Sequence, residues 1–142
     1  MRELQRQLSV DELAELFEGR TRFVEQLAAI DDPLTHARDV AASLSDAEKK
    51  EVLDAHPAIG ERRLSARSAA EQGTDDAPAE LAELNRAYEA KFGFRFVVFV
   101  NGRPKRDLVP IIEHRLERTR EQELATALDE LVSIAEDRWQ RS

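Results

Sequence analysis

Residues 94–100, with the sequence FRFVVFV, form the stretch that decides the fold. Aromatic and β-branched residues in such a run are typical of a β-strand, and the Asn101-Gly102 pair that follows is typical of a hairpin turn. No second strand follows this turn, because the pattern after Pro104 is that of a helix. A lone strand would leave its backbone N–H and C=O groups unpaired. We therefore predict an extended or short helical segment that is threaded through an otherwise helical core.

Capping patterns predict helices on both sides of this segment. Ser9-Val10-Asp11-Glu12 and Ser45-Asp46-Ala47-Glu48 are capping boxes, and Gly19 is predicted to end the first helix in a left-handed conformation. The starts of the other predicted helices are Thr21, Asp32, Glu61, Pro78, Leu108 and Thr119. Since no repeat or linker divides the chain, residues 1–142 are predicted to form a single compact all-α domain with the extended segment at about Phe94–Val100.

Composition excludes several classes of function. A net charge of −8 argues against a nucleic-acid partner, because affinity for the phosphate backbone comes from lysine and arginine. The absence of cysteine excludes a disulfide, a thiolate metal site and a cysteine nucleophile. No apolar run approaches the ~20 residues that span a bilayer, and no secretion signal is evident. We therefore expect a cytoplasmic protein with no membrane partner; a homodimer is compatible with the sequence.

The 3 histidines lie in different settings. His36 and His114 lie among charged residues without ligand spacing to a second metal-binding side chain, and we expect both on the surface. His56 precedes Pro57, which disfavours the helical conformation at His56 and predicts a helix end there. Two interpretations stay open: His56 caps the last carbonyls of the helix, or it is a proton donor whose pKa lies near neutrality.

A second cluster combines a hydroxyl, a carboxylate and an amide. Ser68, Glu71 and Gln72 are spaced at i, i+3 and i+4, so one helix face carries all three. Such a face could hold a small molecule rich in N–H and C=O groups. Alternatively, Arg67 and Glu71 form a surface ion pair, and Ser68 and Gln72 are merely exposed.

Several stretches, in this order, resemble successive motifs of one family, the 2-oxo-4-hydroxy-4-carboxy-5-ureidoimidazoline (OHCU) decarboxylases. The resemblance covers about Phe23 to Trp139, nearly the whole chain. The stretches that carry it are HPAIGE at 56–61, SAAEQ at 68–72, LNRAY at 84–88, KFGFRF at 91–96 and the last helix from Glu123 to Arg138.

The resemblance implies an all-α enzyme of urate breakdown that decarboxylates OHCU to S-allantoin without cofactor or metal. It implies that His56 is the catalytic acid and that Glu71 is its partner across the site. The remaining substrate-binding positions that it implies are Pro57, Ser68, Gln72 and the segment Phe96, Val97, Val98, Phe99 and Val100. The substrate carboxylate would meet an arginine, for which Arg138 and Arg103 are both candidates.

Two features depart from the family pattern. The family commonly has proline where this chain has Arg95, and the stretch from 73 to 83 is shorter than in many relatives. Both concern the pocket lining rather than the pair of His56 and Glu71. Two other functions stay open: a helical protein-interaction module, and a metal-dependent hydrolase, against which the lack of ligand spacing argues.

Overall fold

Residues 7–57 and 78–141, which the computed structural model describes, contain seven α-helices, one 3-10 turn and no β-strand. The prediction of an all-α fold is confirmed. The helices in chain order are α1 (Val10–Phe17), α2 (Arg22–Ala28), α3 (Pro33–Ser43), α4 (Asp46–Asp54), α6 (Ala79–Phe92), α7 (Leu108–Arg115) and α8 (Arg120–Arg141), with the 3-10 turn η1 (Lys105–Asp107) before α7.

The predicted capping boxes are present. The Glu12 amide donates to Ser9 Oγ over 3.1 Å, and the Glu12 carboxylate accepts from the Ser9 amide in return. Ser45 and Glu48 repeat this exchange at the start of α4. Each exchange satisfies amides that the first helical turn leaves without a partner.

Two helix ends differ from the prediction. Glu18, with φ 65°, is the left-handed residue after α1, instead of Gly19. The reason is the bond from the Gly19 amide to the Ala14 carbonyl, which closes the helix only when the residue before Gly19 is left-handed. Asp32 precedes α3 as predicted, but its φ is 49° and its side chain caps no amide.

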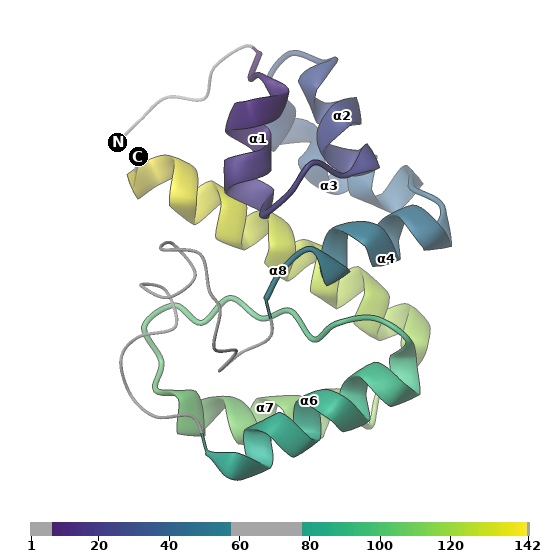
Figure 1. The fold of residues 1–142 in the computed structure, drawn as a ribbon, viewed down its shortest axis with the longest axis vertical. Coiled ribbons are helices and arrows are strands. Elements are labelled where there is room, and N and C mark those ends of the chain that lie inside the picture. Colours follow the sequence, from purple (N-terminus) through teal and green to yellow (C-terminus); the bar gives the residue numbers. More distant parts are fainter. Residues whose placement is uncertain (1–6, 58–77, 142) are drawn as a thin grey trace.

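The longest helix, α8, lies at the centre of the helix packing. It contacts α1, α3 and α4, and α6 pairs with α7 (Figure 1). In Figure 1, α1 to α4 gather on one side of α8, and α6 and α7 lie on the other. The buried face of α8 includes Leu131, Ala135 and Trp139. None of the described helices is long and apolar enough to span a membrane.

The segment from 94 to 100 is extended and has no partner strand within residues 7–57 and 78–141, as predicted. Arginine side chains bind its carbonyls instead. Arg115 Nη1 donates to the Val97 carbonyl over 2.9 Å, and the Arg115 guanidinium lies 4.6 Å from the centre of the Phe96 ring. Arg103 donates to the carbonyls of Phe99 and Val100. The segment therefore stays in the core without a sheet, because cationic side chains donate to the carbonyls of Val97, Phe99 and Val100.

A buried carboxylate holds Arg115 in turn. Glu123, with 0% of its side chain exposed, accepts from Tyr88 Oη over 2.6 Å and from Arg115 Nε over 2.7 Å. Its second oxygen accepts from Arg118 Nη1 over 2.8 Å. Burial, followed by this hydrogen bond to Glu123, raises the pKa of Tyr88 well above its usual value. The cluster links α6, α7 and α8 around the extended segment.

Candidate functional site

His56 lies just past the end of α4, in the interior of the protein. The helix ends at Asp54, and Pro57 follows His56, which agrees with the predicted helix end. Only 4% of His56 is exposed, and its Nε2 atom has no hydrogen-bond partner among the described residues. A buried polar atom without a partner costs about 1–3 kcal/mol, so its presence calls for a functional explanation. His56 is therefore the strongest candidate for chemistry in the described part of the chain.

The surroundings of His56 favour its neutral form. Burial is the largest cause, and with the positive charges of Arg138 and Arg95 it lowers the pKa of His56 from 6.5 to about 3, against the opposing effect of Glu18. The expectation of a pKa near neutrality is therefore wrong for the unliganded protein. Desolvation and two guanidinium groups outweigh the helix terminus, whose partial negative charge favours imidazolium. At neutral pH the site presents a neutral imidazole.

Arg138 brings a buried positive charge to this site. Arg138 is 3% exposed, and its guanidinium donates to the Leu16 carbonyl over 3.1 Å and to Glu18 Oε1 over 3.0 Å. Glu18 is the left-handed residue after α1, a conformation that costs roughly 1–2 kcal/mol in most residues. The ion pair with Arg138 compensates for part of that strain. Of the two arginines considered from sequence, Arg138 is the one whose charge acts on His56.

Arg103, the other arginine considered, is exposed and donates to the carbonyls of Phe99 and Val100. The sequence contained a signal that could have decided between the two. Arg138 stands seven residues after Leu131 and three after Ala135, on the apolar face of α8. A charged residue on the apolar face of a helix is buried together with its apolar neighbours. The same argument predicts burial of Glu123, which lies four residues before Ala127 on that face.

The predicted binding segment lies close to His56. Phe96, Val97, Val98 and Val100 are buried, and Phe99 is partly buried. Within residues 7–57 and 78–141, none of the backbone amides from 96 to 100 donates a hydrogen bond. Arg95, which precedes this segment, donates from Nη1 to the His56 carbonyl over 2.5 Å. The structure thus brings His56, the partly buried Pro57 and the start of the segment together.

The remaining predicted site residues, Ser68, Glu71 and Gln72, lie outside the described residues. His36 and His114 are exposed, as expected. No group of three or more histidine, aspartate or glutamate side chains in the described ranges has the arrangement of a metal site.

The burial of a neutral histidine predicts a particular loss of stability in acid. Below pH 6.5 the unfolded chain binds a proton at His56 that the folded chain does not bind until about pH 3. The contribution of the neutral, buried His56 to the unfolding free energy is therefore complete above pH 6.5. Below that pH it is lost by about 1.4 kcal/mol per pH unit. Between pH 7.5 and pH 5, we expect the wild type to lose about 2 kcal/mol more unfolding free energy than a His56→Asn variant, as measured by urea denaturation. Equal losses in the two proteins would contradict a neutral, buried His56.

Comparison with protein families gives one match over nearly the whole chain. The family model described as OHCU decarboxylase matches residues 2–140. Among curated relatives, 2-oxo-4-hydroxy-4-carboxy-5-ureidoimidazoline decarboxylase of Halalkalicoccus jeotgali is 32% identical over 124 residues, covering 82% of this chain and 70% of that protein. The protein of the same name from Haloferax volcanii is 28% identical over 141 residues, with 89% and 84% covered.

A longer relative and two solved structures agree with this match. The uric acid degradation bifunctional protein of Bacillus sp. (strain TB-90) is 32% identical over 110 residues, which cover 72% of this chain but only 22% of that protein. A crystal structure of OHCU decarboxylase in the presence of (S)-allantoin superimposes with a TM-score of 0.75 at 27% identity, covering 92% of this chain and 96% of that one. A crystal structure of (S)-allantoin synthase superimposes with a TM-score of 0.68 at 23% identity, covering 93% of this chain and 48% of that one. This second match shows a similar fold.

Proposed function

Because the chain belongs to the OHCU decarboxylase family, we propose that it removes the carboxylate of OHCU as CO2 and releases S-allantoin in the degradation of urate. It acts as a carbon–carbon lyase in the cytoplasm and uses no cofactor. The observation that carries this proposal is the buried His56, whose Nε2 atom has no hydrogen-bond partner among the described residues and whose surroundings include the positive charge of Arg138. A homodimer stays a prediction.

The proposed substrate matches the polar groups around His56. Its carboxylate suits the buried guanidinium of Arg138, because charge-assisted hydrogen bonds are strong where water is excluded. Its ring and ureido carbonyls require donors, and the backbone amides of residues 96–100, which have no backbone acceptor within residues 7–57 and 78–141, supply them. Pro57, Ser68 and Gln72 complete the lining in this proposal. An anionic substrate beside His56 also offsets the two guanidinium charges that lower the pKa of the free imidazole.

The reaction needs one proton to leave an oxygen and one to reach a carbon. Loss of CO2 leaves an electron pair that is delocalised onto a ring nitrogen, which takes up one proton from solvent. The substrate hydroxyl must lose its own proton to become the product carbonyl. Since His56 begins as a neutral imidazole, it first receives this proton, directly or through Glu71, and then donates it to carbon. Positioned proton transfer of this kind contributes typically ~10²–10⁴-fold to a rate. Glu71 orients the substrate hydroxyl, and Arg138 stabilises the negative charge that develops as CO2 leaves.

A fixed proton donor predicts a single enantiomer of the product. OHCU also loses CO2 in solution, where either face of the intermediate is protonated and racemic allantoin results. His56 is anchored to the end of α4, so it delivers its proton from one side only. To test this, OHCU is generated from urate with urate oxidase and hydroxyisourate hydrolase, with or without this protein. Circular dichroism then follows the formation of allantoin. We expect a rapid signal of one sign with the protein and a weak or absent signal without it.

Two results would contradict the proposal in different ways. Faster loss of OHCU absorbance with racemic product would mean that the proton comes from water rather than from His56. No change in either observable would remove the decarboxylase function and favour the helical interaction module.

A further inference from the structure

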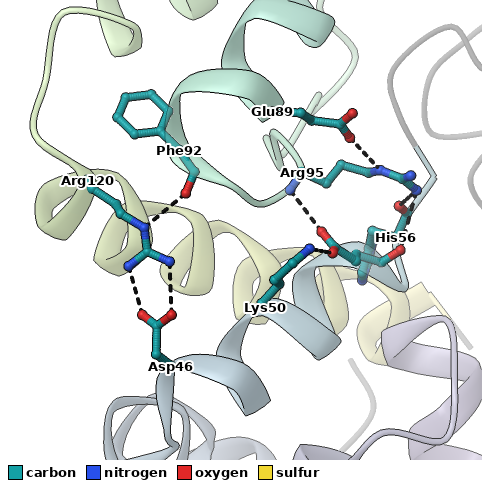
Figure 2. Close-up of polar contacts among 8 residues, drawn as sticks. Asp46, Lys50, His56, Glu89, Phe92, Arg95 and Arg120 are labelled. Atoms are coloured by element: carbon teal, nitrogen blue, oxygen red, sulfur yellow. Dashed lines mark hydrogen bonds and ion pairs between the residues drawn. The ribbon is translucent and has the colours of Figure 1, made fainter.

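Arg95 joins the extended segment to the residue proposed to carry the proton. Its Nη1 atom donates to the His56 carbonyl over 2.5 Å and to the Asp54 carbonyl over 3.4 Å. Its backbone amide donates to Asp54 Oδ1 over 3.0 Å (Figure 2). The other side of the guanidinium is fixed by Glu89 on α6, whose Oε1 accepts from Arg95 Nε over 3.1 Å. One side chain therefore connects α4, α6 and the extended segment.

These contacts lie at the C-terminal end of α4, where helix carbonyls lack donors. The last carbonyls of a helix have no partner within the helix, and the helix end carries a partial negative charge. Pro57 cannot continue the hydrogen-bonded chain, because proline has no N–H group. The guanidinium supplies both the missing donors and the positive charge. His56, which lies within this short stretch, is held by its own carbonyl, whereas its Nε2 atom has no hydrogen-bond partner among the described residues.

Arg95 is itself held in place on several sides. Asp54, which accepts its amide, also pairs with Lys50 one turn earlier on α4. The Arg95 side chain is 27% exposed and so only partly screened by solvent. Because Arg95 is held firmly, it restrains the backbone of His56, to which it is bonded. Such restraint matters because a displacement of about 1 Å can lower a catalytic rate strongly.

We propose that Arg95 is a positioning residue for His56, which fixes the backbone at the end of α4 so that the imidazole meets the substrate held by residues 96–100. The inference rests on the proposed function, in which His56 transfers the proton. It concerns a position where this chain departs from the family pattern, since a proline there could donate none of these hydrogen bonds.

The chain offers a matched control in Arg120. Its Nη1 and Nη2 atoms donate to the two oxygens of Asp46 at the start of α4, over 2.7 and 3.0 Å. Its Nε atom donates to the Phe92 carbonyl at the end of α6, over 2.9 Å (Figure 2). Arg120 thus connects the same two helices through a carboxylate and a terminal carbonyl, as Arg95 does, without contacting His56.

The test compares Arg95→Gln, Arg95→Lys and Arg120→Gln with the wild type. Steady-state assays with OHCU give kcat and KM, urea denaturation gives stability, and NMR of the imidazole C–H groups reports on His56 after assignment with His56→Asn. We expect Arg95→Gln to lower kcat on the order of 10-fold with KM within about 2-fold, since it displaces the proton carrier more than the substrate. Arg95→Lys should recover part of kcat. Arg120→Gln should lose similar stability and keep kcat within about 2-fold.

Several results would overturn the inference. If Arg95→Gln is destabilised as much as Arg120→Gln but keeps its kcat, the role of Arg95 is structural. If KM rises and kcat is unchanged, Arg95 binds substrate. NMR separates these failures from a failure of the proposed function, because it needs no turnover. Arg95→Gln, or Arg95→Lys if the glutamine variant does not fold, must shift the His56 resonances, and Arg120→Gln must not. The charges facing His56 from Arg138 and Glu18 are unchanged in all three variants, whereas Arg95→Gln also removes the charge of Arg95 itself. The shift must therefore also appear in Arg95→Lys, which keeps that charge and changes only the hydrogen bonds.

Discussion

Replacing His56 with asparagine is expected to lower kcat for OHCU by at least about 100-fold at neutral pH, the smallest loss usual for a group that transfers a proton. Asparagine fits in the space of the imidazole but cannot carry a proton between two substrate atoms. The stability at neutral pH should change by no more than about 1 kcal/mol, since the lost Nε2 atom has no hydrogen bond in the described structure. Coupled assays measure kcat, and urea denaturation measures stability.

The matched control for this prediction is His36→Asn. His36 is an exposed histidine on α3, so its replacement should change neither kcat nor stability. Retention of more than about a tenth of the wild-type rate by His56→Asn would contradict a role in proton transfer.

Replacing Glu123 with glutamine is expected to destabilise the fold by about 3–5 kcal/mol, the usual cost of leaving a buried charge without its partner. Arg115, whose side chain is 5% exposed, would keep its charge and lose the carboxylate. Tyr88 would exchange a charged acceptor for a neutral one. The loss is large compared with the 5–15 kcal/mol of a typical domain. It should also loosen the extended segment, because Arg115 holds the Val97 carbonyl. Urea denaturation measures the main effect.

Asp137→Asn provides the control for Glu123→Gln. Asp137 forms an ion pair with Arg141 one turn later on α8, and the Arg141 side chain is 73% exposed. Removing a charge from this pair should cost less than about 0.5 kcal/mol. If the two variants lose similar stability, Glu123 does not hold a buried charge network.

The sequence by itself determined where the described helices begin and where the extended segment lies, while the helix predicted from Glu61 lies outside the described residues. Ser9 and Ser45 cap amides three residues away, and Gly93 ends α6 with φ 82°. Pro57 fixed the position of His56 at a helix end. Interactions of this kind connect residues within one turn of each other, so the pattern of residue types contains them. The roles of Ser68, Glu71 and Gln72 are predictions from resemblance, outside the described residues.

Only the tertiary structure decided the charge of His56 and the identity of its neighbours. Arg138 and Leu16, which meet beside His56, are 122 residues apart, and Arg95 and His56 are 39 apart. The sequence showed the helix end, which favours imidazolium, but not the burial and the guanidinium groups that reverse this preference. The pKa of a buried group depends on every charge and dipole within several ångströms and on the exclusion of water. Both arise only when segments distant in sequence pack together.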